Sequence, residues 1–311
     1  MDNDGHTAGM VRDTFSDGKS FLELLCQKNN GKRGVIIMNN ESALIPKRGF
    51  KFYAQIYRKV LVQDLKSKMS YRADFIISTF GMILTNVVGF MSFYILFKNF
   101  PSINGWNYHE MLFLYGFSLI ALTPLQCLFD NNWSLRYSVE SGDFIKYCFR
   151  PINIFFYFIS EVFDVKGLGQ LAFGVVLLAY SWSHLGIPVT VVTMVQLILL
   201  LITASLFMIA IMNAAAATCF WIVRSGYVMV LMFRFKDYAR YPASIFDGIF
   251  KVLFTFVIPI AFIAYYPGLV ILRPDEVPLL SKLSPLFGIL FFWLSYKFWM
   301  LGARRYDGTG S

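Results

Sequence analysis

The sequence predicts an all-α, polytopic membrane protein with six transmembrane helices and with both termini in the cytoplasm. The chain is 57% hydrophobic and only 15% charged, and its mean hydropathy is +0.55, values typical of a multi-span membrane protein. Several apolar runs reach the roughly 20 residues that a membrane-spanning helix needs. These runs do not alternate polar and apolar residues, and lipid offers no hydrogen bonds to the backbone, so we expect helices.

The net charge of +9 does not indicate a nucleic-acid partner, because of where the basic residues lie. Residues 1–50 carry seven basic and six acidic side chains, so the basic excess lies beside the apolar runs. This is the distribution that the positive-inside rule describes for cytoplasmic loops. We therefore expect a lipid bilayer, and no nucleic acid, as a partner.

The N-terminal segment, residues 1–49, is expected to be a flexible cytoplasmic tail. Within it, Gly18-Lys19-Ser20 matches the end of a Walker A loop. That loop also requires a glycine five positions before Gly18, where this sequence has Asp13. We therefore expect the chain to bind no nucleotide, so any ATP-driven work requires a separate subunit.

Residues 50–73 predict a basic amphipathic helix that lies along the cytoplasmic interface. Residues 50–72 contain six Lys or Arg residues and a single acid, Asp64. A basic helix with an apolar face is typical of a membrane surface. A plainly solvated helix is the alternative, and we disfavour it because the first apolar run follows immediately.

Basic residues assign the sides of the membrane. The connections 99–108 and 183–188 contain no Lys or Arg and are expected outside, whereas 131–153 carries three and is expected inside. Trp106 and Tyr108 fit an aromatic belt at the outer interface. The predicted spans cover residues 75–97, 111–129, 154–182, from 189 onward, 249–265 and 285–301, within a transmembrane domain of residues 74–303.

The segment 189–235 is too long for one span, since a helix of about 45 residues would measure about 67 Å. We expect either that the fourth span continues into the cytoplasm or that the piece after Asn213 lies along the interface. A second full crossing would place Arg224 in mid-membrane and is disfavoured. Pro259 should kink the fifth span. Residues 266–283 are expected to form an external or re-entrant segment, and residues 304–311 a cytoplasmic tail.

A polar stretch between the second and third spans, Glu140–Pro151, predicts one short amphipathic helix. Ser141 or Gly142 suits its cap, Asp143 its first turn, and Arg150 its last turn before Pro151. We interpret it as a handle for a soluble partner, and the alternative is a helix that lies on lipid. Its apolar face would carry Phe144, Tyr147 and Cys148, which recur at i, i+3 and i+4.

Polar residues within the predicted spans are the other candidates for function. Glu161 and Asp164 lie one turn apart in the third span, close to Lys166. A local ion pair or a packing role is favoured for this cluster over a role in coupling or proton movement. We expect interhelical hydrogen bonds, rather than substrate contacts, from Asn86, Gln126 and Gln196.

Aromatic residues on the second and fifth spans are candidates for an apolar cavity, although packing in the core or against lipid is favoured for any one of them. The three histidines are isolated, so we expect no metal site, and the four scattered cysteines contain no C-x-x-C pair, so we expect no disulfide. The candidate cavity residues are Tyr115, Phe117, Phe254, Phe256 and Phe262.

The layout resembles the ABC-2 class of ABC-transporter permeases, in the bacterial subfamily whose permease and ATPase are separate chains. The resemblance covers roughly residues 50–303. It is carried by Tyr71-Arg72-Ala73-Asp74-Phe75, by Ser141-Gly142-Asp143 with Arg150-Pro151, and by Tyr241-Pro242 leading through Ile258-Pro259 to Tyr266-Pro267.

This resemblance implies a permease in the inner (plasma) membrane that pairs with itself or a paralogue above two ATPase subunits. The ATPases would bind ATP and Mg²⁺, so this chain would bind no cofactor and would not itself be an enzyme. Substrate would lie between the two permeases, and alternating access would export a lipid, glycan, peptide or drug-like molecule. The coupling residues would be Glu140, Ser141, Gly142, Asp143, Phe144, Tyr147 and Arg150.

Two other functions remain open from the sequence. An ion-driven secondary transporter would favour buried mid-membrane charges and two similar halves, and we find neither. A non-transporting membrane scaffold or immunity protein is compatible with the composition. Co-purification of an ATPase would favour an ABC-transporter permease over both of these alternatives.

Overall fold

The computed structural model describes residues 49–70, 72–222 and 225–306. The expected N-terminal tail, its Walker-like tripeptide and most of the expected C-terminal tail lie outside these residues. The described part belongs to one compact unit and consists of helices and their connections, with one isolated bridge between Ile103 and Trp106. The predicted all-α polytopic class is confirmed.

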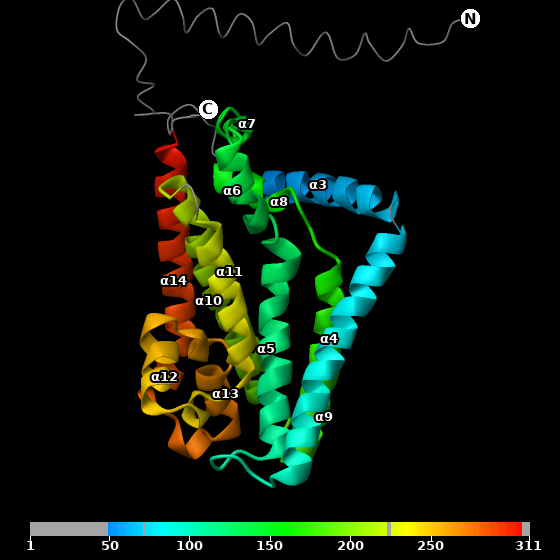
Figure 1. Ribbon diagram of the computed structural model, residues 1–311, viewed down its shortest axis with the longest axis vertical. Helices are drawn as coiled ribbons and strands as arrows, with labels where there is room; N and C mark the ends of the chain where they lie inside the picture. Colours follow the sequence, from blue (N-terminus) through cyan, green and yellow to red (C-terminus); the bar gives the residue numbers. More distant parts are fainter. Residues whose placement is uncertain (1–48, 71, 223–224, 307–311) are drawn as a thin grey trace, which may run out of the picture. The chain divides into compact units, whose positions relative to one another are not determined.

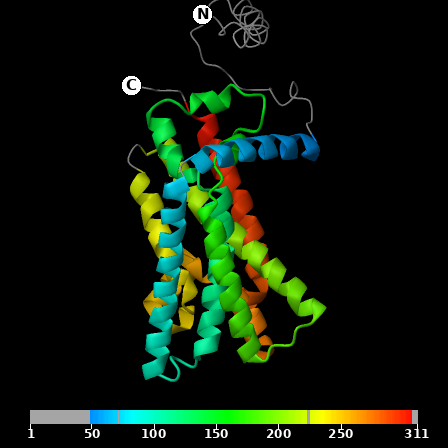
Figure 2. The same ribbon diagram turned by 90° about the vertical axis from the view of Figure 1, so that its right-hand side faces the viewer.

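Five helices in the described part are long and apolar enough to cross a bilayer. They lie alongside one another in both views (Figures 1 and 2). A sixth candidate is a pair of shorter helical pieces separated by a sharp bend. The five are α4 (Arg72–Asn99), α5 (Tyr108–Leu128), α9 (Lys166–Leu185), α10 (Val191–Ala217) and α14 (Leu279–Arg304).

Helix α5 is the central element of the bundle. Its most apolar window is 72% buried, against 17% for α4, so α5 is enclosed by protein while α4 keeps most of its surface free. A capping box starts α5: the Asn107 side chain accepts from the Glu110 N–H, and the Glu110 side chain accepts from the Asn107 N–H.

Small residues let the helices pack in two pairs, α5 with α9 and α10 with α14. A Cβ on Gly116 would lie 2.8 Å from the backbone nitrogen of Leu178 and 3.0 Å from the carbonyl oxygen of Gly174. A Cβ on Gly288 would collide with the backbone carbonyl of Thr203. Both contacts are backbone to backbone, so they set the spacing of each pair.

Helix α3 (Phe50–Ser70) lies across the end of the bundle rather than along it, in both views (Figures 1 and 2). It occupies the segment where the sequence predicts an interfacial helix. Its contact with a lipid surface stays a prediction. The same end carries α6–α8, and we call it the α7 end; the opposite end, with residues 100–107, is called the loop end.

The structure departs from the expected path of residues 189–235, because the chain after α10 turns back and runs along the bundle toward the loop end. After η2 (Thr218–Phe220), helix α11 (Gly226–Phe235) starts beside the Arg136 side chain at the α7 end. The leg continues through η3 (Lys236–Arg240) and η4 (Ala243–Ile245) to the loop end. There Trp106 Nε1 donates to Ser244 Oγ at 2.8 Å. Arg224, on which the sequence-based objection to a further span rests, lies outside the described residues.

Trp106 itself also differs from expectation. The sequence placed it in an aromatic belt at the outer interface, but its side chain is only 1% exposed. It packs against the Tyr265 ring, with ring centres 6.0 Å apart. The indole therefore ties the loop between α4 and α5 to the rest of the bundle instead of facing headgroups.

The predicted fifth span, 249–265, is not a single straight helix, because residues 248–272 form a sharply bent pair of helical arms. Two helical arms meet at 72° around Pro259, which interrupts the helix as the sequence predicted. Both ends of the segment lie at the loop end: Asn104 Nδ2 donates to Ser244 O, and Arg273 donates to Gly105 O at 3.0 Å. The pieces are α12 (Gly248–Val252), η5 (Leu253–Val257), η6 (Ile260–Phe262) and α13 (Tyr265–Leu272). A short turn, η7 (Pro274–Glu276), leads into α14.

The predicted third span, 154–182, is broken as well. Helix α8 (Ile154–Ser160) ends after seven residues, and α9 begins only at Lys166. The non-helical residues between them, 161–165, are called the α8–α9 break.

The α10–α14 contact yields a first prediction. Gly288→Ala should lower the free energy of unfolding by about 1–3 kcal/mol, the usual cost of overpacking, because the Thr203 backbone cannot move aside. Thermal or denaturant unfolding of the purified protein measures this. The matched control is Gly81→Ala on α4, where no atom lies within 4 Å of the added Cβ. It should be neutral or slightly stabilising, and equal losses in both variants would contradict the close contact.

Candidate functional site

The polar stretch between α5 and α8 folds as two helices joined by a tight turn, not as the single helix over 140–150 that the sequence predicts. Helix α6 (Asn132–Glu140) ends where the predicted helix should begin, and α7 (Ile145–Cys148) is only four residues long. Gly142 adopts φ +82°, which reverses the chain, and Phe144 N–H closes the turn on Ser138 O at 2.8 Å. We call residues 132–150 the α6–α7 knob.

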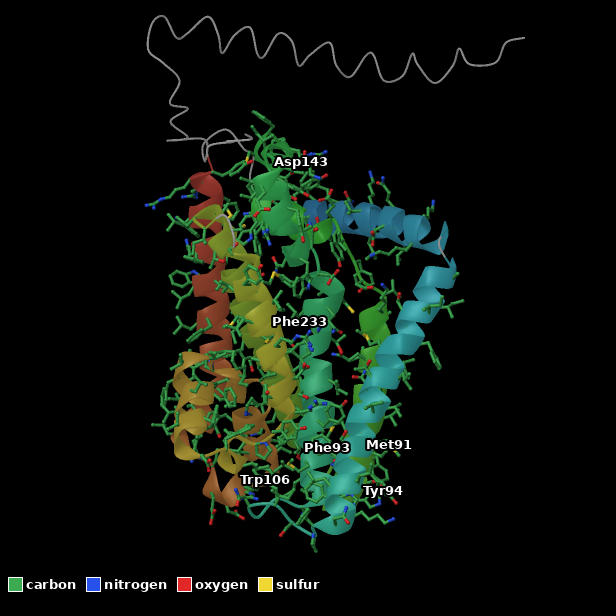
Figure 3. The ribbon with its side chains drawn as sticks, in the orientation of Figure 1. Met91, Phe93, Tyr94, Trp106, Asp143 and Phe233 are labelled. Carbon is green, nitrogen blue, oxygen red and sulfur yellow. The ribbon has the colours of Figure 1, made fainter. Side chains whose placement is uncertain are left out.

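The tip of the knob is polar and exposed. Figure 3 shows Asp143 at the end of the unit opposite Trp106. Ser141 Oγ donates to Asp143 Oδ2 at 2.8 Å, and Arg136 Nε pairs with Glu140 Oε1 at 2.7 Å. Glu140, Ser141, Asp143 and Arg150 are all exposed, and Gly142 is half-buried. Five of the seven predicted coupling residues are therefore accessible at least in part.

The other two, Phe144 and Tyr147, point into the protein, so a partner-contact role for them is wrong. Phe144 is 0% exposed and Tyr147 is 2% exposed. The Phe144 ring lies 5.1 Å from that of Phe220, 5.2 Å from that of Tyr306 and 5.9 Å from that of Trp299, centre to centre. The apolar face that the sequence identified anchors the knob instead of presenting it.

Apolar side chains that the sequence analysis missed face outward beside the polar tip. The i, i+3, i+4 spacing of Phe144, Tyr147 and Cys148 predicts one apolar face, and no second pattern points to the opposite one. The outward side chains are Tyr137, 65% exposed, Ile145, 42% exposed, and Phe149, 77% exposed.

The predicted charge cluster lies in the α8–α9 break, not inside a spanning helix. Glu161 accepts the hydroxyl hydrogen of Tyr147 at Oε2 and lies 3.5 Å from Lys146 Nζ. Asp164 Oδ1 accepts from the Lys166 backbone N–H at 3.1 Å, which starts α9. A continuous helix over 154–182, as the sequence predicts, would instead place Glu161 and Asp164 one turn apart on a single helix.

The α8–α9 break is also bound to α3 and α5. Asp64 accepts from the Phe163 N–H at 3.1 Å, and Lys68 Nζ donates to Phe163 O at 2.5 Å. Lys68 and Asp64 form an ion pair of 2.9 Å. The Asp164 N–H donates to Cys127 O at 3.1 Å, at the end of α5. The α8–α9 break thus connects three parts of the protein. Glu161 binds the knob, Phe163 binds α3, and Asp164 binds the end of the central helix α5.

A second candidate site is a polar cavity of about 420 Å³ between α4, α5, α9 and the α11–η3 leg. Phe233, which lines it, is labelled in Figure 3. Asn86 Nδ2 and Gln126 Oε1 are buried there without a hydrogen-bond partner. The prediction that these two side chains form interhelical hydrogen bonds is therefore wrong for Asn86 Nδ2 and Gln126 Oε1. Gln196 is half-buried on α10 and does not line this cavity.

The five aromatic candidates do not line one apolar cavity within this chain. Tyr115 lines the polar cavity. Phe117, Phe254 and Phe262 are buried among other core side chains, and Phe256 is 68% exposed. Phe262, for example, packs against Phe207 and Tyr266, with ring centres 5.4 Å and 4.8 Å away.

The described residues contain no group of three or more His, Cys, Asp or Glu side chains placed to hold a metal ion. The rings of His109 and His184 stack with their centres 4.5 Å apart near the loop end, but among the described residues they belong to no such group of three.

Comparison with known proteins gave one positive result. A family model described as ABC-2 family transporter protein matches residues 83–310, well over half of the chain. No curated protein and no solved structure matched.

The link between Tyr147 and Glu161 yields a second prediction. Tyr147→Phe should lower the free energy of unfolding by about 1.5 kcal/mol near pH 8, the lower end of the range for a hydrogen bond to a charged group, because Glu161 is partly exposed. Burial raises the pKa of the Tyr147 hydroxyl, and its hydrogen bond to the Glu161 carboxylate raises it further.

A group whose pKa is raised on folding stabilises the fold below its unfolded pKa, about 10 for tyrosine, and loses that contribution as the pH rises. The advantage of the wild type over Tyr147→Phe should therefore shrink above about pH 10. Chemical denaturation at pH 8 and pH 11 measures the difference. An advantage that grows with pH would contradict the assigned bond.

Proposed function

The chain belongs to the ABC-2 transporter family, and we propose that it is the membrane subunit of an ATP-driven exporter whose ATPase is a separate chain. Membership makes it a multi-pass membrane permease of an ABC transporter and implies an ABC ATPase as partner. Direction of transport, the site of the ATPase and the pairing with a second permease belong to the proposal.

The observation that carries the proposal is the α6–α7 knob. It combines exposed charges with exposed rings at one end of the bundle, the composition that protein interfaces concentrate in a small contact patch. In this proposal the exposed Tyr137, Ile145 and Phe149 seat in the ATPase, and Glu140, Asp143 and Arg150 fix its orientation. The buried aromatic cluster around Phe144 would hold the knob in place against the bundle when the ATPase moves it.

A push on the knob would reach the spans through the α8–α9 break. Tyr147 connects the knob to Glu161, and Phe163 connects the same segment to Asp64 and Lys68 of α3. Because α9 begins directly after the break, displacement of residues 161–165 would tilt α9 and α3 together. Such rigid-body movement is a known form of switching between two states.

The basic residues of α3 support an assignment of the α7 end to the cytoplasm, as the positive-inside rule requires. The membrane would then be the plasma (inner) membrane. The ATPase would bind ATP and Mg²⁺ and would perform the hydrolysis, so this chain would hold no cofactor of its own.

A second permease, a copy or a paralogue, would pack against the lightly covered α4. Only 17% of its apolar window is buried within the chain, and Ile76, Ile77 and Phe80 are each more than 60% exposed. Alternating access between two such permeases would export a lipid, glycan, peptide or drug-like cargo.

The proposal predicts that the knob tip governs binding of the ATPase. Asp143→Arg and Phe149→Ala should each reduce the ATPase that co-purifies from native membranes by about tenfold, since loss of an interface anchor costs about 1.4 kcal/mol or more. Insertion and thermal stability of the permease should not change, because both side chains are exposed.

The control is Asp275→Arg, the same change of charge on an exposed side chain in η7 at the loop end. It should co-purify the ATPase as the wild type does. If Asp275→Arg releases the ATPase and the two knob variants retain it, the knob lies on the wrong side of the membrane and the proposed seat is refuted.

A further inference from the structure

We propose that the polar cavity between α4, α5, α9 and η3 binds an amphipathic anion, whose acidic group contacts Arg240 and Asn86 and whose apolar part lies on the cavity wall. The proposal deepens the function given above, on which it rests for the ligand's role as cargo or as a regulating lipid. The binding itself does not depend on the ATPase.

The charges around the cavity leave one cation uncompensated. Lys236 and Asp237 neutralise each other in an ion pair of 2.9 Å. Arg240 forms no ion pair with any carboxylate of the described residues. Its guanidinium carbon lies over two rings, 5.5 Å from the centre of Tyr115 and 5.4 Å from that of Tyr241. The lining therefore carries one net positive charge.

Three polar atoms in or beside the cavity are buried without a partner. They are Arg240 Nε and Asn86 Nδ2, which are donors, and Gln126 Oε1, an acceptor. Asn86 is only 8% exposed, so water does not freely reach its amide. Buried polar groups are normally hydrogen-bonded, and an unpaired one costs about 1–3 kcal/mol. The oxygens of an acidic group would satisfy both donors once the Arg240 and Asn86 side chains turn toward it.

Gly89 on α4 leaves room for Arg240 and Tyr115 to approach that helix closely. A Cβ on Gly89 would lie 2.5 Å from the Tyr115 hydroxyl and 2.9 Å from Arg240 Nη1. The Tyr115 hydroxyl in turn donates to the backbone oxygen of Asn86 at 3.1 Å. The absence of a side chain at position 89 therefore lets Arg240 and Tyr115 reach α4 and form one wall with Asn86.

The size and lining of the cavity indicate more than a bare ion. Its 420 Å³ lies within the range of about 300–1,000 Å³ for sites that hold small organic ligands. Apolar side chains form the rest of the wall and offer a surface to an alkyl or aromatic part. They include Met82, Val88, Leu119, Leu122 and Phe233.

The depth of the site makes the cation costly without a ligand. Tyr115 lies seven residues into α5 and therefore about 10 Å from its first residue at 1.5 Å per residue. Ionisable groups at such depth are expensive in lipid and are functional candidates by default. A bound anion would compensate Arg240 where no carboxylate of the described residues does.

The test uses the full-length chain in nanodiscs of zwitterionic phosphatidylcholine, with dodecyl phosphate as the probe. Dodecyl phosphate should raise the unfolding temperature in a saturable way, whereas dodecylphosphocholine, with the same chain but no net charge, should not. Inorganic phosphate alone should also have no effect at the same concentration, since it lacks the apolar part. A response to inorganic phosphate equal to that of dodecyl phosphate would overturn the amphipathic character.

Substitution then locates the site. Arg240→Gln should weaken the apparent affinity for dodecyl phosphate by about tenfold or more, because a charge-assisted contact is lost. Arg240→Lys keeps a cation and should weaken it less. The matched control, Lys98→Gln, removes a cation from the exposed end of α4 outside the cavity and should bind as the wild type does. Equal affinity in Arg240→Gln and the wild type would overturn the proposal.

A second measurement needs no variant. An alkyl phosphate carrying a diazirine should label the wild type within residues 82–92, 115–126 or 233–240 after illumination. Labelling confined to other segments would overturn the proposal even if Arg240→Gln failed to fold. If the wild type binds no anionic probe but still co-purifies with the ATPase, this inference alone is refuted and the proposed function stands.

Two arms distinguish the source of the anion. If phosphatidylglycerol added to the nanodiscs competes with dodecyl phosphate, the natural ligand is an anionic lipid of the bilayer. If dodecyl phosphate binds unaffected by phosphatidylglycerol, the ligand is a soluble amphipathic anion. Both results support the site, and an absence of binding by both probes refutes it.

Discussion

The structure depends on one constraint: wherever a helix breaks near or within the bilayer, other groups must satisfy the freed backbone. The α8–α9 break meets it with Asp64 and Lys68, which bind the N–H and the carbonyl of Phe163, and with Cys127 O, which accepts from Asp164. Because these partners come from α3 and α5, satisfying the break also fixes those two helices to it. The non-helical segment 161–165 is thus also the point at which α3 and α5 are bound to the start of α9.

Composition and hydropathy predicted the class and the long helices, because those depend on the sum over about 20 residues. They did not predict where helices break. Residues 154–182 are apolar enough to read as one span, yet the chain stops being helical at Glu161, where the Tyr147 hydroxyl and Lys146, close in sequence but on another helix, take up the side chain. Phe144 shows that the sequence also does not determine which way an apolar face points. Its spacing from Tyr147 identified an apolar face, but only the positions of Phe220, Tyr306 and Trp299, far along the chain, determine that this face points inward.

The polar cavity escaped the sequence analysis for a related reason. Asn86, Gln126 and Tyr115 are candidates from the sequence alone, but no spacing in the sequence brings Arg240 to them. Arg240 meets them only because the irregular α11–η3 leg runs along the bundle and brings its charged residues to the cavity. The hydrogen bond between Trp106 and Ser244 reveals the true path, because it binds the end of that leg to the loop before α5.

The knob and the cavity are connected by the same leg. Gly226, the first residue of α11, lies against the side chain of Arg136, which also holds Glu140 at the tip of the knob. From there ten residues of α11 lead directly into η3, which carries Arg240. A movement of the knob would therefore reach the cavity along two routes, through Glu161 and the α8–α9 break, and through Arg136 and α11. The second route ends at the unpaired Arg240, so a partner that displaces the knob would also change the affinity of the proposed anion site beside Tyr115.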